Sequence, residues 1–379
     1  MAMGSIQDKI KHHRWQIEYR RKKKNYKPKP NKSFRNHQGH LCETVRMPER
    51  LDIYDSTQAI NETLATLSRL ERHLVSDFHL ITLDFSQTKI IKAAAILILF
   101  SIIDRLIHEK SKEIKIILRI NHDEQAIKTR SILTKSGLLS LCNRRGYQNI
   151  FNLPHLPIIS SSGGKYREQI VDFIAAKIYK SMPPELEYIY SDAIQEAINN
   201  VTAHAYLSLP ETTPRKWWLL CELLNDQLYL VIYDSGVGIP NTFNINYDFS
   251  NLEWDNETTQ QHFKQIYSEN ISWLASEYPS FETFLESVKQ NKTSVNELPD
   301  HLKIYMAMHG DMTRKEEDKH GQGSKSIKAL VSNNSSGVLW IFSGNGRMKF
   351  REEASRPILD GIPNKLTGTL IQWNIRVAL

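Results

Sequence analysis

The chain has 379 residues, of which 40% are hydrophobic and 24% are charged. This is the composition of a globular protein, and the length is sufficient for two domains with packed cores. The longest apolar run, 93–103, is well short of the roughly 20 residues that span a bilayer, so neither a membrane-spanning helix nor a membrane partner is expected. No apolar secretory segment opens the sequence, which predicts a cytoplasmic protein.

The cysteines and histidines do not form a recognisable metal or redox motif. Cys42, Cys142 and Cys221 are widely spaced and lack the paired spacing of zinc and redox sites. His12 and His13 lie in a basic segment, without an H-E-x-x-H or clustered carboxylate pattern. We therefore expect reduced, structural cysteines and no dedicated transition-metal site.

The positive charge is concentrated near the N-terminus. The formal net charge is +7, but residues 9–35 hold about twelve Lys and Arg against the single acidic Glu18, which leaves the remainder near −4. Residues 1–40 are too charged and too poor in aliphatic side chains to bury a core, so a flexible basic arm is predicted. Its aromatic residues could stack on bases while its lysines contact phosphates, as in a nucleic-acid-binding arm; a solubilising tail is the alternative.

A first folded unit is predicted for residues 41–155. Alternating periodicities predict helices and strands in the order helix 56–73, strand 79–85, helix 93–110, strand 114–120 and helix 123–134. Gly137 is well placed to end the last helix. Strands that alternate with helices favour a βαβ arrangement and an α/β fold.

Part of this unit resembles a STAS domain, the fold of anti-sigma-factor antagonists. The resemblance rests on residues 81–106 (ITLDFSQTKIIKAAAILILFSIIDRL), followed by IKIILR and ILTKSGLLSL. In that family, a phosphorylatable Ser or Thr normally begins the matching helix, whereas this chain has Lys92 followed by three alanines. The resemblance therefore implies a module for docking another protein or for homo-oligomerisation, without the phosphorylation switch.

A second unit follows a Pro-, Ser- and Gly-rich segment, 156–165, which is predicted to be a linker. Helices are expected at 169–180 and 184–206. In the second helix, Glu196, Asn200 and His204 are spaced i, i+4 and i+8, so they share one face. Such a polar stripe is either an ordinary solvated helix face or part of a site.

Further polar and glycine-rich segments follow in the second half of the chain. Strands 217–224 and 227–233, joined by an Asn-Asp turn, lead into Asp-Ser-Gly-Val-Gly-Ile at 234–239. An aspartate at the end of a buried strand can accept a hydrogen bond from an exocyclic amine, and the glycines leave space for a purine. Gly-Gln-Gly-Ser at 321–324 precedes a predicted helix, 325–331, as in loops that present a helix N-terminus to phosphates. Thr-Gly-Thr at 367–369 precedes a last predicted strand, 370–377.

These four segments occur in the order of the GHKL superfamily of ATPases and kinases, which residues 166–379 resemble. The first, EAINNVTAHAY, is closest to the N-box of anti-sigma-factor serine kinases, with Val201 and Ala205 in place of an alanine and a glycine. The resemblance implies the Bergerat fold, an α/β sandwich in which helices cover one face of a mixed, mostly antiparallel sheet.

The resemblance also implies ligands and site residues. ATP would bind with Mg²⁺, which Asn200 would coordinate, while Glu196 would act as the catalytic base. Asp234 would bind the adenine amino group, and Arg314 would sense the γ-phosphate. Further ATP contacts are implied for Gly236, Gly238, Ile239, Gly321, Gly323, Ser324 and Thr369. Ser324 stands where an aliphatic residue is common in the family.

A long insertion separates the second and third motifs, at about 241–320. Helices are predicted at 256–275 and 281–289, and a polar ATP lid at 310–320. An insertion of this size, 241–310 before the lid, favours contacts with a partner protein.

Three functions remain open from the sequence. The first is an ATPase or a nucleotide-gated switch, which the presence of Glu196 favours. The second is an anti-sigma-factor-like serine/threonine kinase with another protein as its substrate, and the third is a non-catalytic nucleotide-binding scaffold. A sensor histidine kinase is disfavoured, because no helical hairpin with a phosphoacceptor histidine precedes the ATP-binding motifs.

Overall fold

The structure is a computed structural model that describes residues 33–35, 41–54, 57–119, 123–146, 149–207, 210, 213–246, 260–261, 263–264, 267–268, 275–276, 278–289, 299–308, 323–334, 336–353 and 357–377. These residues form a mixed α/β protein with parallel and antiparallel sheets. No helix within these ranges is long and apolar enough to cross a membrane. The predicted basic arm, 1–40, lies outside them except for a short strand at 33–35.

The N-terminal unit contains a four-stranded sheet with the order β1-β2-β4-β6. Its strands are β1 (Ser33–Arg35), β2 (Leu41–Arg46), β4 (Leu80–Asp84) and β6 (Glu113–Ile117). β2, β4 and β6 run parallel, and β1 is antiparallel to β2. A separate parallel pair is formed by β3 (Arg50–Leu51) and β5 (Ile90–Ile91). Parallel neighbours require crossover connections, which helices supply here, as the sequence predicted.

The helices of this unit are α2 (Thr57–Arg72), α3 (Ala93–His108), α4 (Glu124–Lys135) and α5 (Leu138–Cys142). The first three coincide with the predicted helices to within a few residues, while α5 was not predicted. Asp123 caps α4 by accepting a hydrogen bond from the backbone nitrogen of Ala126 at 2.8 Å. Gly137 follows α4 with φ of 82°, the left-handed conformation expected of a glycine after a helix end.

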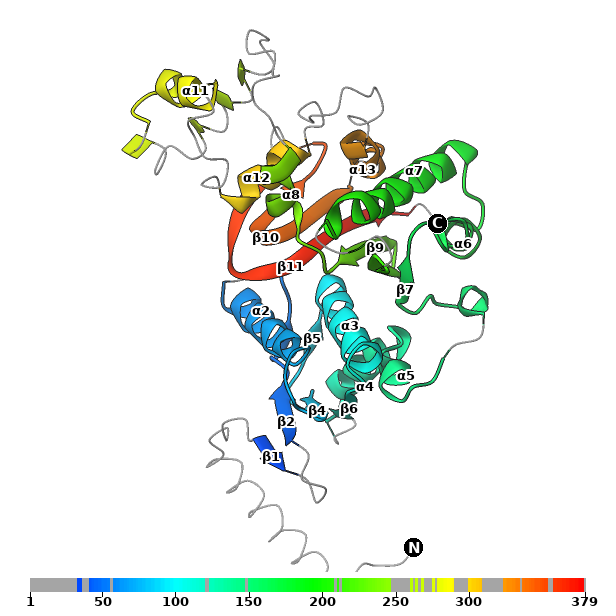
Figure 1. The fold of residues 1–379 in the computed structure, drawn as a ribbon. Coiled ribbons are helices and arrows are strands. Elements are labelled where there is room, and N and C mark those ends of the chain that lie inside the picture. Colours follow the sequence, from blue (N-terminus) through cyan, green and yellow to red (C-terminus); the bar gives the residue numbers. More distant parts are fainter. Residues whose placement is uncertain are drawn as a thin grey trace, which may run out of the picture.

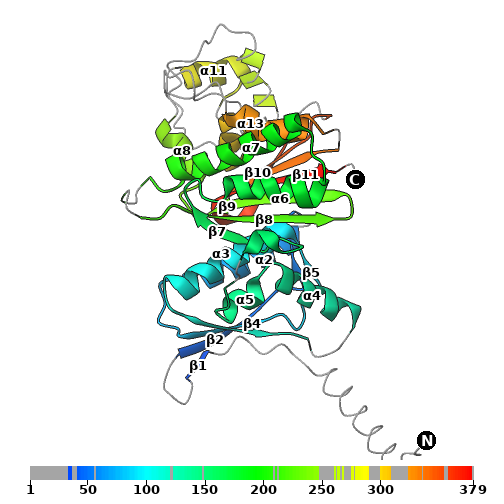
Figure 2. The ribbon, with the colours of Figure 1, turned by 90° about the vertical axis from the view of Figure 1, so that its right-hand side faces the viewer.

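Helix α3 is apolar around almost its whole circumference, and thirteen of its sixteen residues are buried. A helix of this composition needs cover on every side. The N-terminal unit covers one side of it, and a second, five-stranded sheet covers the other, so that one hydrophobic core runs through α2, α3 and that sheet. In Figures 1 and 2, α2 and α3 lie between the two sheets.

The second sheet is antiparallel throughout, with the order β10-β11-β9-β8-β7. Its strands are β7 (Ile159–Ser162), β8 (Lys216–Leu224), β9 (Gln227–Asp234), β10 (Val338–Phe350) and β11 (Ile358–Arg376). The predicted two-residue turn between β8 and β9 is present, and Asn225 adopts a φ of 57°, which asparagine tolerates better than most residues. Strand β11 begins twelve residues before the predicted strand, 370–377, and β10 was not predicted.

The segment 156–165, predicted to be a linker, contains strand β7. Ile159 and Ser161 are buried while Ser160 and Ser162 are exposed, and the strand pairs with β8. The pairing satisfies backbone groups along an edge of the sheet that a linker would leave open to solvent. Strand β7 therefore belongs to the second sheet, and the two units are joined through a shared core.

Helices cover the other face of this sheet. They are α6 (Arg167–Phe173), which continues as a π-helical turn η2 (Ile174–Tyr179), α7 (Pro184–Asn200), α12 (Asp300–Ala307) and α13 (Gly323–Ser332). Together with the sheet they enclose a second hydrophobic core. A 3₁₀ turn η1 (Ile150–Asn152) precedes β7. The sheet thus has helices of its own unit on one face and α2 and α3 on the opposite face (Figure 2).

The predicted insertion contributes α8 (Ile239–Asn246), α11 (Phe281–Lys289) and α12. The predicted helix 281–289 coincides with α11, which stands away from the sheet in Figure 1. Its Phe284 packs with Phe263 and Tyr267, which are buried. The predicted helix 256–275 lies mostly outside the described residues, and the lid at 310–320 lies entirely outside them.

Candidate functional site

Helix α7 carries the first group of predicted site residues. Proline at its first position and acidic residues in its first turn favour the helix start, and its apolar face packs into the core through Tyr190, Ala193, Ile194, Ala197 and Ile198. Glu196 and Asn200 lie one turn apart on a half-buried face. The helix then continues as a π-helical turn, η3 (Val201–Ala205), in which His204 is exposed.

The π-helical turn matters because it changes the rotation of the chain just after Asn200. Wider turns of this kind interrupt the regular 3.6-residue spacing and often occur at functional sites. Asn199 lies on another face, where it accepts a hydrogen bond from Gln195 Nε2 at 2.6 Å. Of the three residues of the predicted stripe, Glu196 and Asn200 are half-buried and His204 is exposed.

The start of α13 lies directly against Glu196. A Cβ atom added to Gly323 would be only 2.0 Å from Glu196 Oε1, so no larger residue fits there without moving the carboxylate. Ser324 is the second residue of α13 and is half-buried. The structure thus brings together two motifs that are more than a hundred residues apart. Gly321 and Arg314, the other residues predicted on this side, lie outside the described residues.

Asp234 ends β9 between two strands, opposite Trp217 of β8 and Thr369 of β11. Its side chain is buried and accepts a hydrogen bond from the backbone nitrogen of Gly236 at 2.8 Å. Burial raises the pKa of Asp234 to about 7, because the interior penalises the ionised form. The carboxyl therefore changes its charge near neutral pH, which is unusual for an aspartate and typical of functional sites.

The glycines after Asp234 are required by close packing. A Cβ on Gly236 would be 2.1 Å from the backbone oxygen of Ala205, and that oxygen accepts a hydrogen bond from Val237 at 2.7 Å. Gly238 has φ of 84° and lies against Gly368. The end of the π-helical turn η3 therefore packs against the loop 235–238 and is hydrogen-bonded to it.

Ser343, in β10, joins three parts of this region and was missed by the sequence analysis. Its hydroxyl donates to the Gly368 oxygen at 2.8 Å, accepts from the Ile239 nitrogen at 2.9 Å and lies 3.1 Å from Thr369 Oγ1. The predicted residues Gly238, Ile239 and Thr369 therefore lie together. Ser343 has no motif of its own, and only the pairing of β10 with β11 places it there.

The predicted Mg²⁺ ligand is a single amide side chain, Asn200. Among the described residues, no group of three or more His, Cys, Asp or Glu could hold a metal ion. An amide oxygen is a hard ligand that suits Mg²⁺ when phosphate oxygens and waters complete the octahedron. The residue type at this position therefore fits the predicted ion.

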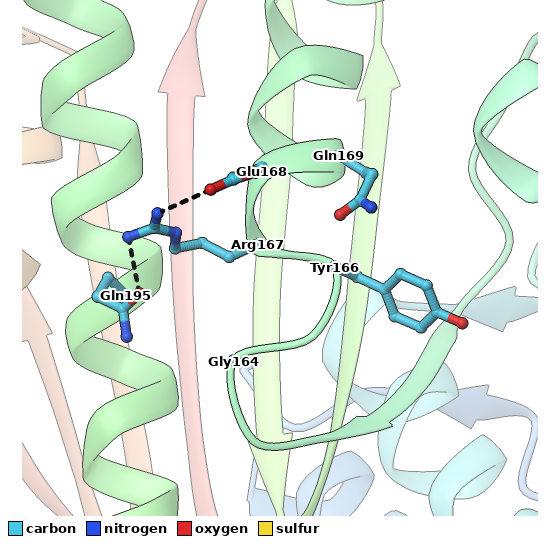
Figure 3. A pocket seen from close by; sticks show the side chains of 6 residues that line it. All are labelled: Gly164, Tyr166, Arg167, Glu168, Gln169 and Gln195. Atoms are coloured by element: carbon cyan, nitrogen blue, oxygen red, sulfur yellow. Dashed lines mark hydrogen bonds and ion pairs between the residues drawn. The ribbon is translucent and has the colours of Figure 1, made fainter.

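A pocket lies on the other side of α7, lined by Gly164, Tyr166, Arg167, Glu168, Gln169 and Gln195 (Figure 3). The Arg167 guanidinium donates to Gln195 Oε1 at 2.8 Å and lies 3.4 Å from Glu168 Oε1. None of the predicted site residues lines this pocket. It is therefore distinct from the region around Asp234 and Glu196.

The cysteines do not take part in either region. Cys42 and Cys221 are buried and Cys142 is half-buried, and none forms a disulfide. Burial raises the pKa of both Cys142 and Cys221 to about 12, so these two are thiols at neutral pH.

Comparison with known proteins adds no relative to this geometry. No model of a known protein family matches the chain, and no curated protein sequence matches it.

Proposed function

We propose that residues 166–379 form a Mg²⁺-dependent ATP-binding domain of the Bergerat type, fused to a STAS-like unit. The observation that carries the proposal is the contact of α7 and its π-helical continuation η3 with two glycine motifs. Gly323 contacts Glu196 of α7, and Gly236 contacts Ala205 of η3, nine residues later. At a rise of 1.5 Å per residue, these contacts are about 13 Å apart along the helix. This separation supports a phosphate end near Glu196 and an adenine end near Asp234.

At the adenine end, Asp234 accepts a hydrogen bond from the exocyclic amine of the base when its carboxyl is ionised. Thr369 lies opposite Asp234 in the sheet, and its Oγ1 lies at hydrogen-bond distance, 3.1 Å, from Ser343 Oγ. Gly236, Gly238 and Ile239 shape the space for the base. The buried position of Asp234 strengthens this bond, because little water competes for the carboxylate.

At the phosphate end, Asn200 binds the Mg²⁺ ion that neutralises the charge of the phosphates. Glu196 orients and deprotonates the attacking water, as expected of a general base within reach of the γ-phosphate. Gly321, Gly323 and Ser324 hold the phosphates near the start of α13, and Arg314 of the lid senses the γ-phosphate. In this proposal, the protein hydrolyses ATP or uses it to switch between conformations.

The N-box similarity keeps a protein serine/threonine kinase as the second candidate, and a non-catalytic scaffold as the third. Incubation with γ-labelled ATP and Mg²⁺ separates the three. We expect free phosphate from the wild type, ATP binding without phosphate release from Glu196→Ala, and weakened ATP binding without phosphate release from Asn200→Ala. Gln195→Ala is the matched control, because Gln195 lies on α7 but points to the other side.

Each outcome has one interpretation. Label on an added protein supports the kinase, and binding without release or label in the wild type supports the scaffold. The absence of phosphate release, of label and of any ATP-dependent shift in melting temperature would refute the ATP-binding proposal itself.

Partner binding is a second part of the proposal. The insertion 241–310 favours a protein partner, since α11 stands away from the sheet (Figure 1). The basic segment 9–35 favours nucleic acid, and deletion of residues 1–40 is expected to abolish salt-sensitive binding to DNA or RNA. Unchanged binding after this deletion would refute the role of the arm.

A further inference from the structure

Polar groups of the second sheet contact a single carboxylate of the N-terminal unit, that of Asp104. Asp104 lies on α3, where its side chain is only 6% exposed. Its Oδ2 accepts hydrogen bonds from Trp218 Nε1 at 3.0 Å and from Ser160 Oγ at 2.9 Å, and lies 3.6 Å from Lys216 Nζ. A buried carboxylate is unfavourable unless it is well paired. The three contacts of Oδ2 with β7 and β8 contribute to that pairing, and His108 Nδ1 of α3 lies 2.8 Å from Oδ1.

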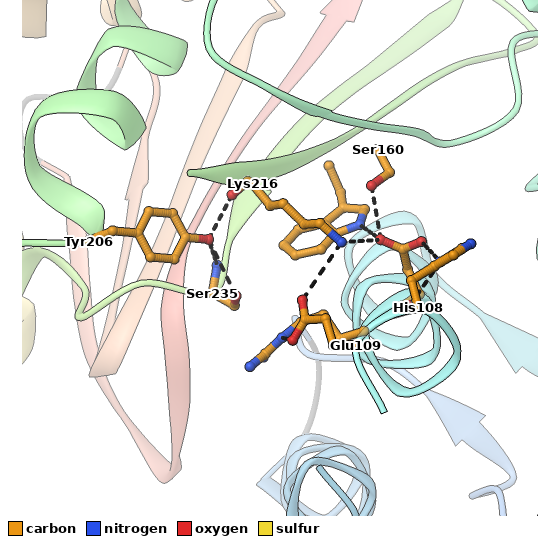
Figure 4. A network of polar contacts seen from close by, with 9 residues as sticks. His108, Glu109, Ser160, Tyr206, Lys216 and Ser235 are labelled. Carbon is orange, nitrogen blue, oxygen red and sulfur yellow. Dashed lines mark hydrogen bonds and ion pairs between the residues drawn. The ribbon is translucent and has the colours of Figure 1, made fainter. Parts of the chain in front are cut away.

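The polar contacts continue from Lys216 toward the proposed adenine end (Figure 4). Lys216 Nζ also lies 3.6 Å from Glu109 Oε1, and the backbone oxygen of Lys216 accepts a hydrogen bond from the Tyr206 hydroxyl at 2.7 Å. The same hydroxyl accepts from the backbone nitrogen of Ser235 at 3.3 Å. Ser235 directly follows Asp234. A series of contacts thus connects Asp104 to Ser235, the residue next to Asp234, which is proposed to bind the adenine.

Tyr206 is suited to hold this connection at neutral pH. Burial raises the pKa of its hydroxyl to about 12, so the proton that it donates to Lys216 remains in place. The hydroxyl has one proton and two lone pairs, which allows it to donate to one backbone and to accept from another. It therefore connects the first residue of β8 to the loop 235–238.

We infer that the N-terminal unit positions the nucleotide loop, with Asp104 as the positioning residue and with Lys216 and Tyr206 as the connection. Asp104 fixes β7 and β8 against α3, and Tyr206 transmits this position to the backbone of Ser235. The loop then presents Asp234 to the base. The consequence for ATP binding rests on the proposed function, whereas the positioning of the loop 235–238 does not require a bound nucleotide. A partner that separates α3 from the sheet would weaken ATP binding.

The test measures amide hydrogen exchange of residues 235–238 in the nucleotide-free, full-length protein. Tyr206→Phe and Asp104→Ala are each expected to speed exchange there about fivefold, the equivalent of one hydrogen bond. Asp104→Asn keeps an acceptor oxygen and is expected to restore most of the protection. Asn61→Ala is the control, because it removes a contact with Asn364 across the same interface that does not belong to the series of contacts between Asp104 and Ser235.

ATP affinity provides the second readout. Both Tyr206→Phe and Asp104→Ala are expected to raise the Kd for ATP about fivefold, with the hydrolysis rate at saturating ATP within about twofold of wild type. The Kd of the double variant for ATP is expected to be no higher than that of the single variant that binds ATP less tightly, because both substitutions act through one connection.

The outcomes separate the two proposals. Unchanged exchange at 235–238 in Tyr206→Phe, or an equal effect of Asn61→Ala, would overturn the positioning role. Additive losses of ATP affinity would also overturn it. If Asp104→Ala does not fold, Tyr206→Phe and Lys216→Met form the pair that decides. If the wild type binds no ATP, the proposed function fails, and the exchange experiment still decides whether Asp104 positions the loop.

Discussion

Replacement of Asp234 by asparagine is expected to stabilise the nucleotide-free protein. Burial raises the pKa of this carboxyl from 3.8 to about 7. Between these values the folded protein holds a proton that the unfolded chain has lost, so the stability of the fold decreases as the pH rises. A shift of about three units corresponds to about 4 kcal/mol at about pH 8, and to about 2 kcal/mol at about pH 5. Asparagine carries no charge and avoids this loss.

Urea unfolding of wild type and Asp234→Asn across this pH range measures the difference directly. The advantage of the variant is expected to grow from about 2 to about 4 kcal/mol between about pH 5 and 8, while its affinity for ATP falls. Asp226→Asn is the control, because Asp226 is half-exposed in a surface ion pair with Arg376, which contributes less than about 1 kcal/mol. An advantage that is absent, or that does not change with pH, would refute the reasoning about the buried carboxyl.

Three further predictions concern the same region. Gly236→Ala forces a Cβ to within 2.1 Å of the Ala205 oxygen; overpacking of this kind costs about 1–3 kcal/mol, and an unchanged melting temperature would contradict the packing. Gly323→Ala displaces the Glu196 carboxylate, so steady-state phosphate release is expected to fall about 100-fold, and wild-type turnover would argue against that role. Chelation of Mg²⁺ is expected to weaken calorimetric ATP binding about tenfold in the wild type but not in Asn200→Ala; equal losses in both would exclude Asn200 as the ligand.

The features predicted correctly from the sequence are those with strong local signals. The hairpin β8–β9 follows from two apolar runs around a two-residue turn at Asn225, and α11 follows from its amphipathic pattern. The end of α4 follows from Gly137. Each of these depends on residues that are neighbours in the chain, which is why they could be predicted.

Features that depend on distant segments could not be predicted in the same way. Strand β7 contains one isoleucine and three serines, and it forms because β8 offers a free edge. Ser343 reaches Ile239 across about a hundred residues of chain, through a strand that was not predicted. The π-helical turn after Asn200 has no sequence signal, and the predicted single helix, 184–206, did not include it.

The burial of α3 lies between these two cases. Its sequence is apolar on all sides, which indicates that something must cover it, but not which element does so. The element that covers α3 is the second sheet, through the face opposite α7. This interface could not be predicted from the sequence, because it is formed by residues far apart in the chain.

The central claim, that Asp234 and Asn200 belong to one ATP site, is tested most directly by calorimetric titration of the full-length protein with ATP and Mg²⁺. The expected result is one saturable site per chain, with affinity lowered at least about tenfold in Asp234→Asn and in Asn200→Ala, a loss of about 1.4 kcal/mol, and unchanged in Asp226→Asn. No saturable heat of binding in the wild type, or equal affinity in all four proteins, would contradict the claim.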